Sequence, residues 1–209
     1  MGAKKVVWFA GTMIYCFFCW LMLRITLQYI PIDTDVAFLR IKQEYIGMWH
    51  YRVAFFAHVF AAILALMAGF TQFSTLLRRQ YPDLHRWSGW LYAANVLFVA
   101  GPSGLVIGIY ANGGWSSQLA FCLLAILWMG FTGMAVWSIR RGDVAAHRRW
   151  MIRSFALTLS AITLRAWKFA IVAAFEPRPM EVYRVVAWLG WVLNLAVAEW
   201  WISRRRARQ

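Results

Sequence analysis

Six long apolar runs constrain this chain more strongly than any other feature of its sequence. A helix needs about 20 predominantly apolar residues to cross the hydrocarbon core of a bilayer. The runs that approach or exceed this length are roughly Val6–Leu23, Val53–Leu77, Gly89–Tyr110, Ser116–Ile139, Trp150–Phe175 and Val182–Ser203. They predict an all-α integral membrane protein, a six-transmembrane-helix bundle in which residues 1–209 form a single transmembrane domain.

The composition excludes the main alternatives to a membrane protein. Hydrophobic residues make up 62% of the chain and charged residues only 14%, whereas soluble domains carry about 25% charged residues. A disordered chain, a disulfide scaffold and a water-soluble enzyme are therefore ruled out. The net charge of +14 comes without a basic stripe or recognition motif, so we expect no nucleic acid as partner. The expected partner is a lipid bilayer with anionic headgroups.

The positions of the basic residues predict the orientation. Lys and Arg gather in the connections on one side of the predicted bundle, namely Lys4, Lys5, Arg78, Arg79, Arg86, Arg140, Arg141, Arg148, Arg149, Arg204, Arg205, Arg206 and Arg208. Cytoplasmic loops carry such an excess. We therefore expect a multi-pass protein of the bacterial inner membrane with both termini in the cytoplasm.

The one long connection, residues 24–52, is then periplasmic. Asp33 and Asp35 offer N-caps for a helix. Apolar residues follow at helical spacing, namely Phe38, Ile41, Tyr45 and Met48. This pattern predicts a short amphipathic helix that lies on the outer membrane surface.

Two cytoplasmic connections share a motif. A double arginine is followed after five residues by His-Arg, at Arg78-Arg79 with His85-Arg86 and again 62 residues later at Arg140-Arg141 with His147-Arg148. One interpretation is an internal repeat, in which helices 2-3 and 4-5 are related by a pseudo-twofold axis along the membrane normal. The other is chance, since double arginines are common in cytoplasmic loops.

Several segments resemble a known family. They are His58, Gly69-Phe70-Thr71-Gln72-Phe73, Asp83-Leu84-His85-Arg86, Gly89-Trp90-Leu91-Tyr92, the run from Arg141 to Ser154, Thr163-Leu164-Arg165, and Trp191-Val192-Leu193-Asn194-Leu195 with Glu199. Over roughly residues 53–203 the chain resembles the domain-of-unknown-function family 2306 of bacterial predicted membrane proteins. The resemblance implies a polytopic helical membrane protein and no established activity.

The leading candidate site is the cytoplasmic rim, where His85 and His147 begin two helices. Two imidazoles on different helices suit one b-type haem as axial ligands. Alternatively, the two helix N-termini, with Arg86, Arg148 and Arg149, would bind an anionic lipid head or the carbonyl of a quinone. These alternatives predict a binding or redox-accessory protein. The simplest alternative is a set of ordinary interfacial residues.

Two charged residues lie inside predicted spans. Arg153 and Glu199 are each about 6 Å deep, counted at 1.5 Å per residue from the ends of spans five and six. A charge inside the membrane needs a partner. We therefore predict an interhelical ion pair between them, with a structural role.

A second polar level is expected toward the outer face. His58, Arg165 and Asn194 would line an outer pocket, and Pro102 predicts a kink in helix three. Together they suggest a small solute transporter as an alternative function. A structural partner subunit of a membrane complex is a third hypothesis. No Walker loop, zinc-protease motif or nucleophile elbow assigns an enzyme activity.

Overall fold

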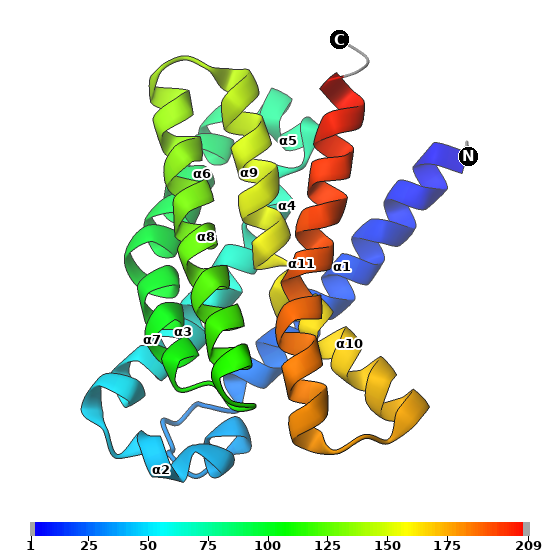
Figure 1. Cartoon of the computed structure of the whole chain (residues 1–209). Coiled ribbons are helices and arrows are strands. Elements are labelled where there is room, and N and C mark those ends of the chain that lie inside the picture. The colour runs from blue at the N-terminus through cyan, green and yellow to red at the C-terminus, as the bar shows by residue number, and fades with distance from the viewer. Residues whose placement is uncertain (1–2, 207–209) are drawn as a thin grey trace.

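The computed structural model describes residues 3–206, which form a bundle of helices (Figure 1). Five stretches are long and apolar enough to cross a membrane, namely Phe9–Leu27 in α1 (Ala3–Leu27), Trp49–Gln72 in α3 (Trp49–Met67) and α4 (Gly69–Gln72), Pro82–Ile109, Trp115–Arg140 (α8), and Pro179–Arg205 in α11 (Pro179–Arg206). The bent pair α9 (Val144–Thr158) and α10 (Ser160–Phe175) makes a sixth when it counts as one broken span. The prediction of an all-α membrane protein is confirmed.

The two ends of the bundle differ in character. One end, here called the arginine-rich end, carries α5 (Thr75–Gln80), the turn between α8 and α9, and the last turns of α11 (Figure 1). The other end is covered by residues 28–48, here called the cap, which include α2 (Gln43–Ile46). The three arginine-bearing patches of the sequence therefore belong to one end.

The second apolar run does not continue as one helix to Leu77, as the sequence predicts. α3 ends at Met67, and the short helices α4 and α5 follow. Ser74 starts α5, because its Oγ accepts a hydrogen bond from the Leu77 N–H at 3.2 Å. Gly69 allows the close packing at the break, since a Cβ there would lie 2.3 Å from the Phe155 ring. The run is therefore a span that ends at Gln72, followed by the separate short helix α5.

The third span contains a π-helical turn, η2 (Val96–Ala100), between α6 (Pro82–Asn95) and α7 (Gly101–Ile109). Pro102 is the second residue after this turn, and its missing N–H and bulky ring disturb the preceding turn. The irregularity predicted at Pro102 is thus a widened turn within one 28-residue span. Side chains bond to the carbonyls of this turn, as membrane helices require: Ser103 to Val99, and His58 of α3 to Ala100 at 2.9 Å.

The fifth span is broken at Leu159, where α9 and α10 meet at 40°. Asn194 of α11 bridges the break, because its amide donates to the Ala156 carbonyl at 3.1 Å and to Thr163 Oγ1 at 2.9 Å. The offset of 62 residues that relates the two arginine motifs places Leu159 opposite Leu97, inside η2. The two halves therefore share the position of a break, although α4 and α5 have no counterpart between α8 and α9.

The cap is not an amphipathic helix on the membrane surface. It forms a 3₁₀ helix, η1 (Ala37–Lys42), and the single turn α2. Asp33 does not cap either helix; its Oδ1 accepts from the Asp35 N–H at 2.9 Å, and Val36 is the N-cap residue of η1.

The face of the cap that is buried also differs from the predicted one. Leu39 and Ile46 are buried, whereas Ile41 is 62% exposed. A 3₁₀ helix repeats every three residues, which places Leu39 and Lys42 on one side. That side packs on an aromatic cluster at the start of α3, which includes Tyr51 and Phe55. The cap therefore belongs to the protein core at this end.

A buried polar network crosses the centre of the bundle. Tyr92 of α6 contacts Ser154 and Thr158 of α9 at 2.6 and 2.9 Å. Trp128 and Thr132 of α8 bond to the same hydroxyls. Each member has a partner, so the network fixes the relative positions of three helices at no cost in unpaired polar groups.

Arginine and tryptophan pair at the arginine-rich end. Among the described residues, five guanidinium groups there lie 4.0 to 5.3 Å from an indole centroid, in the pairs Arg140–Trp90, Arg141–Trp137, Arg153–Trp150, Arg204–Trp200 and Arg205–Trp201. Both residue types favour the membrane–water interface. The pairs therefore mark the level of the interface on this end.

Candidate functional site

His85 is held at the start of α6 by α4. Gln72 of α4 donates to the His85 carbonyl at 3.0 Å and to Ser88 Oγ at 2.8 Å, and Thr71 Oγ1 also donates to Ser88. Gly89 leaves room for the Gln72 side chain, which would lie 3.1 Å from a Cβ at that position. The imidazole lies against the backbone of Thr71. Its Nδ1 is enclosed and has no hydrogen-bond partner among the described residues.

His147 is positioned by the turn between α8 and α9. Gly142 has φ of +80°, and the N–H groups of Gly142 and Asp143 bond back to Ile139 and Ser138. This is a Schellman motif, which ends α8. Asp143 then caps α9 by accepting from the Ala146 N–H at 2.7 Å. The sequence Gly142-Asp143 thus sets the start of α9 and places His147 in its first turn.

The His147 ring is oriented by α8. Its Nδ1 lies 2.9 Å from the Ala135 carbonyl. A carbonyl only accepts, so Nδ1 carries the hydrogen and Nε2 is left for another partner. His147 and His85 lie within electrostatic range of each other, at the arginine-rich end where α6 and α9 begin.

An arginine cluster surrounds this pair. Arg78 of α5 is within electrostatic range of His85 and of Arg148 of α9, and Arg205 of α11 is within range of Arg148. All three arginines are exposed. No carboxylate forms an ion pair with them among the described residues. Arg78, Arg148 and Arg205, here called the arginine cluster, therefore concentrate uncompensated positive charge.

Two of the arginines predicted for this site form no ion pair or hydrogen bond with either histidine among the described residues. Arg86 is turned to Asp83, with Nη1 3.5 Å from Oδ1 and both side chains largely exposed. It lines a surface cleft with Trp87 and Trp90. No contact of Arg149 with either histidine is found in the described part of the chain. Sequence reasoning missed Arg78 and Arg205 as members, although Arg78 opens the repeated motif.

The arrangement does not favour a bis-histidine haem. Nε2 of His147 has no hydrogen-bond partner among the described residues, and a hydrogen bond from the other ring nitrogen is typical of a histidine that ligates a metal. The unpartnered nitrogen of His85, however, is walled in by protein, so the ring would have to move before iron could reach it. The residues present fit an anion better than a porphyrin.

Arg153 and Glu199 lie together as a bidentate pair. Nε and Nη2 of Arg153 are 2.5 and 2.7 Å from the two carboxylate oxygens of Glu199. The guanidinium group also lies over Trp150. The pair joins α9 to α11 and neutralises a half-buried charge, which is a structural role.

The residues predicted for the outer pocket are placed differently from one another. Asn194 is committed to the break at Leu159, as described above. His58 of α3 and Arg165 of α10 lie within electrostatic range of each other. Of the three residues predicted for the outer pocket, His58 and Arg165 are therefore near each other, whereas the Asn194 amide is used at the break.

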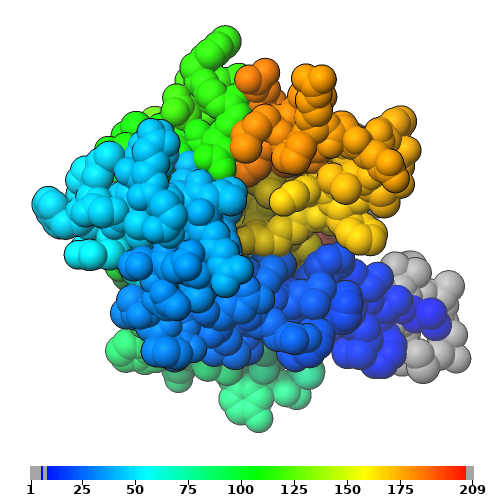
Figure 2. Space-filling model, turned by 90° about the horizontal axis from the view of Figure 1, so that it is seen from below, coloured from blue at the N-terminus to red at the C-terminus, as the bar shows by residue number. Residues whose placement is uncertain are grey.

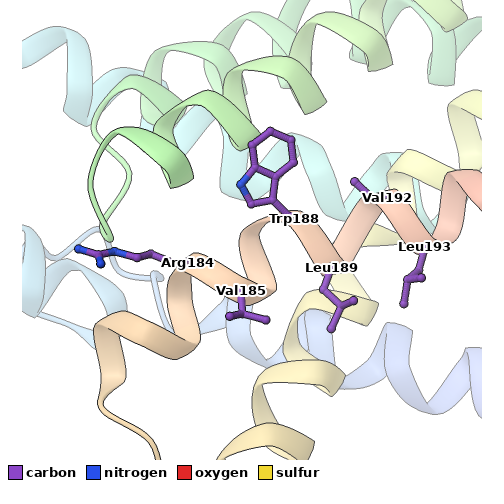
Figure 3. Close-up of a pocket in the computed structure, with 6 residues that line it drawn as sticks. All are labelled: Arg184, Val185, Trp188, Leu189, Val192 and Leu193. Atoms are coloured by element: carbon purple, nitrogen blue, oxygen red, sulfur yellow. The ribbon is translucent and has the colours of Figure 1, made fainter.

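An apolar groove of about 560 Å³ runs along the outer side of α11 (Figure 3). Its lining residues are Arg184, Val185, Trp188, Leu189, Val192 and Leu193. Arg184 at one end is already bound to the Gly113 carbonyl at 2.8 Å. The groove is shallow and open, and it resembles the lipid-facing side of any membrane helix more than a ligand site.

These features define a polytopic helical membrane protein with a basic rim. A family model described as "Predicted membrane protein (DUF2306)" matches residues 55–202. The chain belongs to this family, as the resemblance in its sequence predicts. No curated protein and no solved structure matches the chain.

Proposed function

We propose that this protein binds a phosphate-bearing anionic headgroup at the arginine-rich end, on the cytoplasmic side of the bacterial inner membrane. The observation that carries the proposal is the arginine cluster, in which three helices bring Arg78, Arg148 and Arg205 together without a carboxylate. Like charges at close range repel unless an anion lies among them.

Three features favour a phosphate over the other predicted ligands. The guanidinium fork matches phosphate oxygens in a bidentate manner. α9 starts beside the cluster and points its positive end toward this rim. Three fixed cations call for a charged partner, which a quinone carbonyl is not. His147 Nε2 adds one more group for hydrogen bonding, and His85 lies within electrostatic range of His147.

A lipid titration tests this proposal. The full-length protein in detergent is supplemented with phosphatidylglycerol or with phosphatidylcholine, and the thermal unfolding midpoint and the lipid retained in native mass spectrometry are measured. We expect phosphatidylglycerol to be retained and to stabilise the protein. Arg148→Gln and Arg205→Gln should each weaken this binding about fivefold, since a basic residue near an anionic surface contributes about 1 kcal/mol.

Arg86→Gln is the matched control, because it removes one exposed charge at the same end but outside the cluster. Inorganic phosphate and glycerol 3-phosphate separate a lipid headgroup from a free phosphate. Equal lipid retention by the cluster variants and the control would contradict the proposal.

A second candidate function is passage of a solute from the cap end. The π turn η2 and the break at Leu159 favour it, because broken helices line the sites of many transporters. Flux of a solute into proteoliposomes tests it, and equal flux in empty liposomes contradicts it.

A further inference from the structure

The surface at the cap end is hollowed. Figure 2 looks onto this end and shows a depression where the cap, α10 and α11 meet, with the yellow of the α9–α10 segment at its bottom. In Figure 1, α10 leaves the bundle beyond the break at Leu159. The bend of 40° therefore opens the bundle on this side.

The elements that border this hollow also carry the groups around Arg165 of α10. Three other elements place a group within its electrostatic range: His58 in α3, Tyr29 before the cap helices and Tyr183 in α11. A side chain surrounded from three sides would ordinarily be buried, yet that of Arg165 is exposed. It therefore faces an open space between these elements.

The charge of Arg165 has no counterion. Its one hydrogen bond in the described chain runs from Nη1 to the Ala161 carbonyl of its own helix, at 2.6 Å. No carboxylate lies within ion-pair distance among residues 3–206. Nε and Nη2 are thus left to bind something else. An unpaired arginine at membrane depth that faces a cavity marks a binding site by default.

Two neighbours supply further polar groups. The Tyr183 hydroxyl has no hydrogen-bond partner within the described residues and is not enclosed, so it can donate. His58 gives its Nδ1 hydrogen to the Ala100 carbonyl at 2.9 Å, so that Nε2 of the neutral ring accepts. Gly104 makes this orientation possible, because a Cβ there would lie 2.9 Å from the imidazole.

We infer that the hollow binds a small hydroxycarboxylate monoanion that enters from the cap end. Its carboxylate takes the free donors of Arg165 and the Tyr183 hydroxyl, and its hydroxyl group donates to His58 Nε2. One fixed cation beside a neutral imidazole matches a single negative charge, whereas a dianion would leave one charge uncompensated. The bidentate fit of guanidinium to carboxylate provides the orientation.

This inference deepens the second candidate function by naming its ligand, and it is independent of the headgroup site at the opposite end. Binding is measured by isothermal titration calorimetry of the full-length protein in detergent, with lactate, propionate and succinate as probes. We expect lactate to bind more tightly than propionate, because a site built to bond a hydroxyl discriminates against the analogue that lacks it. Succinate should bind least.

Substitutions assign the residues. Arg165→Gln should weaken lactate binding about tenfold or more, because it removes a charge-assisted bidentate contact. Arg165→Lys keeps the charge without the fork and should fall between Arg165→Gln and wild type, which also guards against a variant that fails to fold. Lys168→Gln is the matched control: it removes an exposed cation from the same helix and should leave binding unchanged.

Sidedness is tested by labelling. With Cys16, Cys19 and Cys122 replaced by Ala, Arg165→Cys should react with a membrane-impermeant maleimide from the cap side of proteoliposomes. The proposed site is contradicted if lactate does not bind or if Arg165→Gln leaves lactate binding intact. It is also contradicted if the cysteine of Arg165→Cys does not react. Equal binding of lactate and propionate would overturn the role of His58. If lactate does not bind but phosphatidylglycerol is still retained, the inference about the hollow is wrong and the headgroup proposal is unaffected.

Discussion

Lys42 is the residue that connects the cap to the end of α7. In the cap it is only 2% exposed, and its Nζ donates to the Tyr110 carbonyl at the end of α7. The ammonium group lies 5.0 Å from the Tyr45 centroid and 5.9 Å from that of Phe38. A charged side chain thus fastens the cap to the C-terminus of a helix, where cations are favoured.

Lys42 makes the stability of the cap depend on pH. Burial lowers the pKa of Lys42 below its ordinary 10.5, and Glu44 opposes this in part. The unfolded chain then binds more protons than the folded one between the two pKa values, so stability rises with pH through that window and is lost as pH falls through the lower value. We expect the thermal unfolding midpoint of wild type to rise relative to that of Lys42→Met as the pH increases toward 10.5. Parallel curves for the two proteins would count against this expectation.

The sequence alone does not predict contacts of this kind, in which a residue bonds to a partner far along the chain. The pattern of the cap places Lys42 on a solvated face, because nothing in one sequence shows that Tyr110, far along the chain, lies above it. The network around Tyr92 was missed for the same reason: its hydroxyls come from three helices, and each alone resembles a small polar residue on an apolar face. By contrast, the proximity of Arg153 and Glu199 followed from depth and helix order alone.

At the scale of elements, the break between α9 and α10 is the central feature. Hydropathy predicts one span over this region, because both segments are apolar and no proline or glycine marks the break. The compensating contacts come from α11, where Asn194 bonds across the break and Gly190 lets α10 approach closely. The position of a break depends on such partners, which periodicity does not reveal.

Gly190→Ala tests this contact. A Cβ at this position would lie 2.9 Å from Leu164 Cβ and 3.1 Å from its Cα, so a main chain would have to move. We expect a loss of about 1–3 kcal/mol in unfolding free energy, as for other overpacked sites. Gly130→Ala is the control, since a Cβ there meets nothing within 4 Å. It should raise helix stability by up to about 1 kcal/mol. Equal effects of the two substitutions would refute the role given to Gly190.

For the whole molecule, the sequence predicts the number of spans and the grouping of the arginines well, because both depend on composition over long windows. It does not predict which arginines converge. Arg205 joins Arg148 through the packing of α11 against α9, and Arg78 comes near it through the packing of α5 against α6. The sequence therefore predicts a candidate site at the same end as the arginine cluster, but it identifies only Arg148 of the three arginines.

The orientation of the whole protein is tested by labelling from one side. In a variant whose three native cysteines are replaced by Ala, Asp33→Cys in the cap should react with an impermeant maleimide added to intact cells. Arg141→Cys, at the arginine-rich end, should react only after the membrane is opened, since basic loops stay in the cytoplasm. The reverse pattern would show that the cap faces inward, and it would move the proposed headgroup site to the other leaflet.

The five arginine–tryptophan pairs indicate where the membrane–water interface lies on this end of the protein. Guanidinium groups on indole rings favour the headgroup region, so we expect these pairs to oppose movement of this end along the membrane normal. A bilayer with shorter or longer lipid tails must then be matched at the opposite rim. There α10 bends away from α9 by 40° beyond Leu159, so we expect the membrane's thickness to affect the segment that carries Arg165 more than the arginine-rich end.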